Sequence, residues 1–278
     1  MFFDAFATLG GWGRLIGFII ALLYFGVLNS FIGKGQTIGK RITKIKVVDR
    51  DGQLIPLNKS FLRYAILAPP FFLNGALIPP SVMMSVLGVI IDLIIFGVGG
   101  AIIYLYTFNR RTRQSLHDLV TGSFVVGASA KESTALTRVW KYHYLIVSIW
   151  CLIILIFAVI ISPMIQRREG FSSLLTLHNS IQNSGKVHMA SVFVGTNWGP
   201  NGQNQYLTVN AIWKNKPVSS EVAASEIASV VLREYQDINN KNILAVTIAY
   251  GFDIGIASGW ESYNENHSPA EWREKLQQ

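Results

Sequence analysis

The chain has 278 residues, of which 50% are hydrophobic and only 14% are charged, a composition typical of integral membrane proteins and not of soluble globular ones. The net charge of +8 is concentrated in residues 1–164, which hold 15 Lys and Arg against 6 Asp and Glu, whereas residues 165–278 hold 9 against 10. Because the basic residues lie between apolar segments, we expect them to contact anionic lipid headgroups of a bilayer and not nucleic acid.

Four apolar segments are long enough to cross the hydrocarbon core of a bilayer as helices. A short tail, Met1 to Gly13, precedes the first of them and lacks the basic start of a secretory signal. The second contains Pro69 and Pro70, which remove backbone donors and clash with the preceding turn, so we expect this helix to be kinked or broken. The predicted spans are Trp12 to Ile32, Phe61 to Ile78, Val82 to Tyr106 and Tyr144 to Met164.

A basic segment, Gln36 to Arg63, separates the first two spans. Within it Ile45 and Val47 alternate with lysines, as in a strand that has one face in contact and one face solvated. Asp51-Gly52 accepts the positive φ angles of a tight turn, and Leu54-Ile55 can begin a return strand. The segment therefore predicts a small β-hairpin on the membrane surface, and Phe124 to Val126 are expected to add a strand to it.

The distribution of Lys and Arg predicts the orientation of the chain in the cell membrane. The loop from Lys34 to Lys59 carries seven of these residues and the loop from Arg110 to Lys141 carries six, while the connection near Pro79 carries none. We therefore expect both basic loops to be cytoplasmic and the region after the fourth span to be extracytoplasmic. Arg167-Arg168 argues weakly for the opposite orientation.

Residues 169–278 predict a soluble α+β domain. A helix after Pro217 is expected to be capped by Ser219, because a serine hydroxyl accepts from the free N–H groups of a first turn. Phe252 to Ala257 either continue the third strand or form a fourth. The expected strands are Val187 to Gly195, Tyr206 to Trp213 and Ile243 to Tyr250, the first two joined by a turn at Trp198 to Gly202, and further helices are expected at Ser172 to Ile181 and Ser268 to Leu276.

Two sequence motifs lie beside the apolar spans in the first half of the chain. The first is Gly35-Gln36-Thr37-Ile38-Gly39-Lys40-Arg41, followed by Val47-Val48-Asp49, Asp51-Gly52 and Arg63, and the second is Ser115-Leu116-His117-Asp118-Leu119-Val120-Thr121-Gly122-Ser123. Together they resemble the motifs of the RDD family of small polytopic membrane proteins over residues 12–126. The motif residues carried over are Gly39, Lys40, Arg41, Arg63, His117 and Asp118.

This resemblance implies a membrane domain over residues 1–140 with three spans, and it does not extend to the second half of the chain. The apolar and strand patterns there predict a fourth transmembrane helix and linker over 141–168 and the soluble domain over 169–278. The family is named for one Arg and two Asp residues. Arg14 matches the Arg and Asp118 the second Asp, but the place of the first Asp, near Ala21, holds no acid. Cation or proton transport has been suggested for some members of the family.

Asp92 is the candidate for such chemistry, because it lies inside the third predicted span between two apolar runs. An ionised carboxylate at that depth costs a few kcal/mol, and such residues usually mark an ion or proton path. The alternative is a neutral Asp, or one paired with a nearby Arg, that serves only helix packing. Arg14 either joins this path or extends its charge to the membrane interface. Candidate partners of Asp92 are Arg14, Arg63, Asn29 and Asn74.

His117-Asp118 invites two interpretations. Because histidine titrates near neutral pH, the pair is a candidate proton relay. Alternatively, it caps a helix or forms a salt bridge with the basic hairpin, and Lys40 or Arg41 would then be the partner of Asp118. His178, His188 and His267 lack the spacing of metal ligands. No nucleophile with a matching base is recognised, and we expect neither an enzyme nor a bound cofactor or metal.

The sequence therefore predicts an α-helical integral membrane bundle of about four transmembrane helices, with a small cytoplasmic β-hairpin and a C-terminal soluble α+β domain. Two functions remain open. The first is cation or proton transport through an intramembrane carboxylate, for which a chain with so few spans would form a homo-oligomer. The second is a membrane-anchored interaction or sensing protein whose extracytoplasmic domain binds a protein partner.

Overall fold

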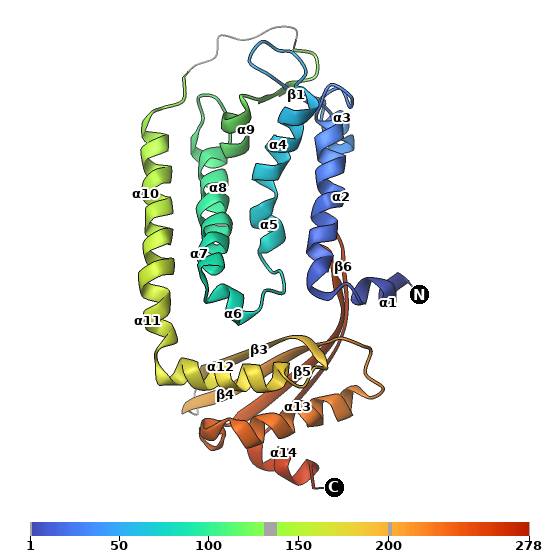
Figure 1. The fold of residues 1–278 in the computed structure, drawn as a ribbon, viewed down its shortest axis with the longest axis vertical. Coiled ribbons are helices and arrows are strands. Elements are labelled where there is room, and N and C mark those ends of the chain that lie inside the picture. The colour runs from blue at the N-terminus through green and yellow to red at the C-terminus, as the bar shows by residue number, and fades with distance from the viewer. Residues whose placement is uncertain (1, 131–137, 200–201, 278) are drawn as a thin grey trace. The chain divides into compact units, whose positions relative to one another are not determined.

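The computed structural model describes residues 2–130, 138–199 and 202–277 (Figure 1). The chain divides into two compact units. The first, called the membrane unit below, contains residues 14–162 with residues 254–256. The second, called the sheet domain, contains residues 1–13, 163–253 and 257–278.

Helices dominate the membrane unit. In chain order its elements are α2 (Gly13–Leu28), α3 (Ile38–Ile42), β1 (Ile45–Val48), α4 (Leu57–Leu67), α5 (Pro69–Leu73), α6 (Pro80–Met83), α7 (Val86–Asp92), α8 (Gly99–Phe108), α9 (Leu116–Thr121), β2 (Phe124–Gly127) and α10 (Tyr142–Ile156). π-Helical turns at Leu93–Val98 and Phe157–Ile161 join α7 to α8 and α10 to α11 (Ser162–Gln166).

Three continuous helices in the described part of the chain are long and apolar enough to cross a membrane: Gly10–Leu28, Val86–Phe108 and Tyr142–Gln166. The second predicted span is instead two short helices, because α4 ends at Leu67 and α5 begins with Pro69 at its first position. The predicted break at the prolines is confirmed. About four transmembrane helices were expected; three of the described helices are long and apolar enough to cross a membrane, and the broken segment is not one of them.

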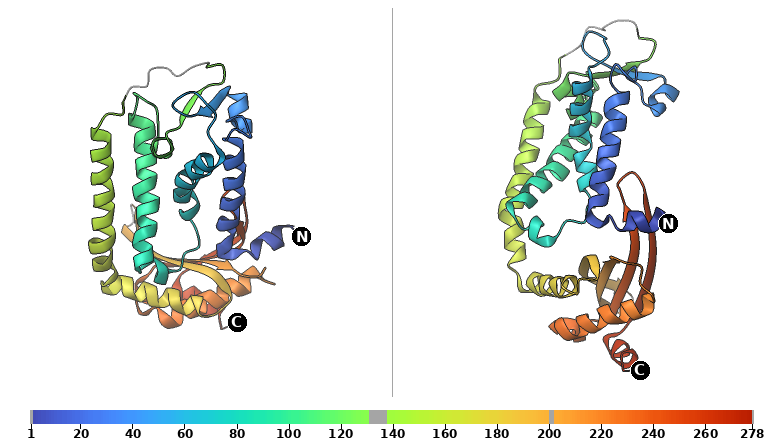
Figure 2. Two further views of the ribbon diagram at one scale, coloured as in Figure 1. Left: turned by 45° about the horizontal axis from the view of Figure 1, so that its top comes forward. Right: turned by 45° about the vertical axis from the view of Figure 1, so that its right-hand side comes forward.

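These four helical segments run side by side (Figure 1, Figure 2). Aromatic rings join α2 to the broken segment: Phe25 stacks on Tyr64 at 4.6 Å between ring centroids, and Phe18 meets Phe72 edge-on at 5.6 Å. Small side chains at Ala21 and Ala68 are buried between the same helices, which lets the backbones approach.

The predicted hairpin is wrong in its second strand. β1 pairs antiparallel with β2, residue for residue from Ile45–Gly127 to Val48–Phe124. The tight turn does form, because the Asp49 carboxylate accepts from the backbone N–H groups of Asp51 and Gln53, at 2.9 Å each. The chain does not return as a strand, since the Ile55 carbonyl accepts instead from the N–H of Phe31.

The sheet domain is a four-stranded mixed sheet with the order β3-β4-β5-β6. Its strands are β3 (Val187–Gly199), β4 (Gly202–Trp213), β5 (Ile243–Asp253) and β6 (Ser258–His267), and its helices are α1 (Phe2–Ala7), α12 (Glu169–Gln182), α13 (Ser220–Glu234) and α14 (Pro269–Lys275), with short 3₁₀ turns at Gly10–Trp12 and Gln236–Asn240. β4 and β5 are parallel, and α13 lies in the crossover between them; the other neighbouring pairs are antiparallel.

One face of this sheet carries the hydrophobic core. Leu207, Val209 and Ala211 of β4 alternate with less buried residues, and they pack with apolar side chains of α12 and α13. Trp272 of α14 is fully buried and donates its indole N–H to the Leu244 carbonyl at 2.9 Å. The Ser219 cap of α13 is as predicted, with its hydroxyl accepting from Val222 N–H. The predicted turn at Trp198 to Gly202 includes residues 200–201, which lie outside the described residues.

Two elements of the sheet domain were not predicted. The N-terminal tail forms α1, whose Phe3 and Phe6 contact Phe252 of β5 at 5.6 and 5.1 Å between ring centroids. Tyr250 of β5 donates to Asp4 at 3.2 Å. β6 is the second addition, since β5 runs on to Asp253 before the chain turns back. Both ends of the chain therefore build the same domain.

Candidate functional site

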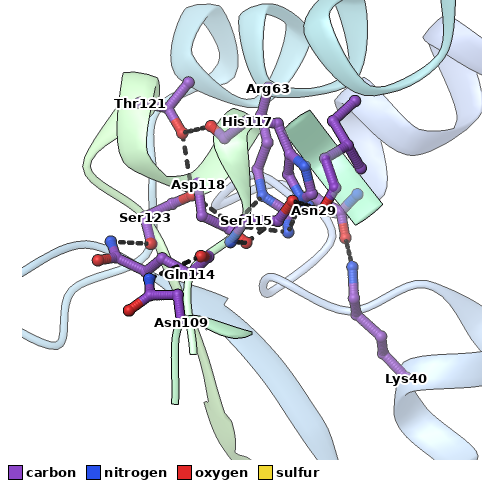
Figure 3. Close-up of polar contacts among 11 residues, drawn as sticks. Asn29, Lys40, Arg63, Asn109, Gln114, Ser115, His117, Asp118, Thr121 and Ser123 are labelled. Atoms are coloured by element: carbon purple, nitrogen blue, oxygen red, sulfur yellow. Dashed lines mark hydrogen bonds and ion pairs between the residues drawn. The ribbon is translucent and has the colours of Figure 1, made fainter. Parts of the chain in front are cut away.

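A buried ion pair joins α4 to α9 in the membrane unit (Figure 3). Arg63, on the inner face of α4, donates from Nε to Oδ1 of Asp118 at 2.8 Å, and its Nη2 forms an ion pair with the same oxygen at 2.8 Å. The two residues are only 6% and 4% exposed. Since a charge removed from water needs a partner and hydrogen bonds, this geometry fixes α4 against α9. The predicted pairing of Asp118 with Lys40 or Arg41 is therefore wrong.

The short helix α9 holds Asp118 in place. Asp118 Oδ2 accepts from the backbone N–H of Ser115 at 3.4 Å, as the acid of a capping box does, and Ser123 Oγ donates to Oδ1 at 3.0 Å. Gly122 ends the helix at φ 62°, a left-handed conformation that costs glycine little. The Ser-Leu-His-Asp-Leu-Val-Thr-Gly-Ser motif thus folds into a capped turn that aims one carboxylate at Arg63.

His117 completes the cluster. Its Nε2 lies 3.1 Å from Arg63 Nη2, and because a guanidinium only donates, Nε2 accepts and carries no proton. Its approach of 3.3 Å to Asp118 Oδ2 is accordingly not a hydrogen bond. Nδ1 carries the proton, and it is buried without a hydrogen-bond partner among the described residues. Burial, opposed by the Asp118 charge and assisted by Arg63 and Lys40, lowers the pKa of His117 to about 4.

This neutral histidine predicts acid sensitivity. The folded-state pKa of about 4 lies below the ordinary value of 6.5, so between these values only the unfolded chain binds the proton. The free energy of unfolding should therefore fall as pH drops from 6.5 towards 4, by ~3 kcal/mol in total. Thermal unfolding of the full chain in detergent across this range measures the fall. His117→Gln, whose amide oxygen can accept from Arg63, should flatten this pH dependence. His267→Gln is the control and should keep it. A fall in His117→Gln equal to that of the wild type would show that His117 is not its source.

Lys40 and Asn29 lie next to the ion pair. Lys40 Nζ donates to Asn29 Oδ1 at 2.5 Å (Figure 3). Desolvation and the Arg63 charge lower the pKa of Lys40 to about 8, while Asp118 opposes the shift. Lys40 therefore loses its proton at far lower pH than an ordinary lysine. Since its folded pKa lies below 10.5, its burial penalty is present below pH 8 and is relieved as pH rises to 10.5.

The remaining motif residues play smaller parts. Gly39 lies in α3, and a Cβ there would meet nothing within 4 Å, so no steric reason for glycine is visible in the described residues. Arg41 is exposed. Of the six motif residues, the structure therefore brings together Lys40, Arg63, His117 and Asp118.

Asp92 and Arg14 stand apart from this cluster. Asp92 ends α7, is half-buried, and has no hydrogen bond or ion pair with any described residue. Arg14 donates to the carbonyls of Phe71 at 3.1 Å and of Asn74, at the end of α5. These are carbonyls that a broken helix leaves without internal partners. None of the four candidate partners forms a hydrogen bond or an ion pair with Asp92 among the described residues. Arg63 is bound to Asp118, and Asn29 accepts from Lys40.

The polar shell around the cluster was not predicted. Thr121 Oγ1 lies 2.9 Å from Ser123 Oγ, Gln114 donates to the Ser123 carbonyl at 2.9 Å, and Asn109 donates to the Gln114 carbonyl at 2.9 Å. The available signal was the density of amides and hydroxyls between residues 107 and 123 beside an apolar span. Among the described residues, no group of three or more His, Cys, Asp or Glu could hold a metal ion.

Comparison with known proteins agrees with the motif resemblance. Residues 2–122 match the model of the RDD family, which confirms the resemblance of the first half of the chain. A curated relative, the uncharacterised protein YckC of Bacillus subtilis (strain 168), is 27% identical over 113 residues, which cover 41% of this chain and 61% of the relative. The match thus spans about three fifths of the length of that relative. No solved structure matches the chain.

Proposed function

The chain carries an RDD-family membrane region, and we propose that this region transports a cation or a proton through a site at Asp92. The observation that carries the proposal is the unpaired carboxylate itself. Asp92 lies in a helix that is long and apolar enough to cross a membrane, and no described residue neutralises it. A carboxylate that served only packing would be expected to have a polar partner at that depth.

The local backbone supports the same site. Asp92 immediately precedes the π-helical turn at Leu93–Val98. Such turns leave backbone groups with altered partners and occur often at functional sites. Here the Phe96 carbonyl of the turn accepts from the indole N–H of Trp150 in α10 at 2.9 Å. A carboxylate beside an irregular turn can bind a cation or proton and release it when the turn shifts.

Arg14 and the Arg63–Asp118 cluster have supporting roles in this proposal. Arg14 holds the carbonyl end of α5, so it keeps the broken helix in position and is not the counter-charge of Asp92. The cluster ties α4 to α9 at the end of the membrane unit that carries β1 and β2. With both basic loops cytoplasmic, as the distribution of Lys and Arg predicts, the cluster lies at the cytoplasmic end of the path.

Flux measurements on reconstituted protein test the activity. The full chain, inserted into liposomes that contain a pH-sensitive dye, should move protons when a Na⁺ or K⁺ gradient is imposed. Protein-free liposomes give the background. If wild-type protein, shown by protease protection to be inserted, moves no protons under either gradient, the transport proposal fails.

A second function is favoured by the sheet domain. This domain has its own core, with a fully buried Trp272 and apolar side chains from α12, α13 and three strands. An ion carrier has no need of such a domain. As a membrane-anchored interaction protein, the chain would present it, on the extracytoplasmic side, to a protein partner. Asp92→Asn would then leave function intact, whereas removal of residues 170–278 would abolish it.

A further inference from the structure

Two adjoining pockets of the membrane unit differ in chemistry. The first, of about 410 Å³, is called the polar pocket because Arg50, Thr112, Gln114 and Arg138 line it, together with apolar and aromatic residues such as Phe124, Val139 and Tyr144. The second, of about 270 Å³, lies between α8, α9 and α10 and is lined mainly by apolar side chains, including Leu105, Leu116, Val120 and Val147. Leu119 and Tyr144 line both, so the polar pocket opens beside the apolar one.

The described residues that line the polar pocket include basic side chains and no counter-charge. Arg50 and Arg138 come from loops that are distant in sequence, yet both residues line it, and neither has an ion-pair partner among the described residues. Among the residues that the structure describes, no Asp or Glu lines the pocket. Thr112 Oγ1 accepts from Asn109 at 2.7 Å, which leaves its own hydroxyl hydrogen free to donate. Arginine forks bind phosphate oxygens in pairs, so this set of donors suits a phosphate group.

The apolar pocket decides which phosphate compound fits. A free phosphate ion would use only the first pocket and would leave the adjoining apolar surface unfilled. A phospholipid matches both, because its charged headgroup and its acyl chains are joined at the glycerol. We propose that one anionic phospholipid binds here, with its phosphate between Arg50 and Arg138 and an acyl chain along Leu105, Leu116 and Val147. This site is separate from Asp92, which lines neither pocket.

Lipid binding by variants of the full chain tests both halves of the site. Native mass spectrometry of the detergent-purified protein would measure retention of added phosphatidylglycerol, with phosphatidylcholine of the same acyl chains for comparison. The double variant Arg50→Gln/Arg138→Gln should bind phosphatidylglycerol at least about tenfold more weakly, since each arginine contributes a charge-assisted contact. Ser148→Trp, which fills the apolar pocket from α10, should weaken it as well.

Matched controls lie outside the pockets. Arg110→Gln removes an exposed arginine of the same loop, and Ile149→Trp adds the same indole one residue along α10; neither residue lines either pocket, and both variants should bind like the wild type. Because all of the substituted side chains are exposed, folding is not at risk. Equal retention by the double arginine variant and its control would overturn the proposal. Displacement of phosphatidylglycerol by inorganic phosphate at equal concentration would also overturn it, in favour of a soluble phosphate site.

Discussion

Replacement of Arg63 by methionine is expected to lower the free energy of unfolding of the membrane unit by about 3–5 kcal/mol. The reason is the partner that remains. Without Arg63, the Asp118 carboxylate keeps only Ser123 Oγ and the Ser115 N–H as donors while 4% exposed. A buried charge without its counter-ion costs far more than the pair itself contributes. Calorimetry of the full chain in detergent measures the loss.

The double variant Arg63→Met/Asp118→Leu separates this explanation from simple loss of packing. With both charges gone, more than half of the stability should return, because an apolar pair of similar volume avoids the desolvation cost. Lys186→Met is the control, since Lys186 and its partner Glu226 are 56% and 37% exposed and such surface pairs contribute ~0–1 kcal/mol. If Arg63→Met costs no more than this control, the ion pair does not hold α4 to α9.

The parts of the fold that were predicted from the sequence depend on local features: hydropathy, prolines and the periodicity of buried residues. Hydropathy over about 20 residues identified the apolar helices, and two prolines located the break between α4 and α5. The strands β4 and β5 were recognised because one face of each is buried and the period of two is therefore visible. The edge strand β6 was missed, since most of its residues are exposed and its sequence, SGWESYNENH, has little alternation.

Contacts between distant segments explain what could not be predicted. β1 pairs with β2 some 80 residues away. A strand at Phe124 to Val126 was predicted to join β1, but no local signal showed that it would take the place of the adjacent segment at Leu54-Ile55. α1 looked like a tail because six residues carry too little periodicity, and its aromatic side chains find their partners on β5 only in the folded domain.

The residues of the candidate site could be predicted from the sequence, but the ion pair that forms between two of them could not. The motif residues Lys40, Arg63, His117 and Asp118 do come together. The sequence analysis assigned Lys40 or Arg41 to Asp118, because His117-Asp118 was expected to form a salt bridge with the basic hairpin. Arg63 forms the pair because its position on the inner face of α4 buries it against α9, and that depends on how the helices pack.

Proton flux through the Asp92→Asn variant is the measurement that tests the central claim most directly. Asparagine keeps the shape of the side chain but has no titratable oxygen, so a path that depends on a proton or cation at this carboxylate should close. Asp92→Glu retains the carboxylate and serves as the matched control. In liposomes under a Na⁺ or K⁺ gradient, we expect Asp92→Asn to fall to the level of protein-free liposomes while Asp92→Glu keeps measurable flux. Flux through Asp92→Asn equal to that of the wild type would show that this carboxylate is not part of the path.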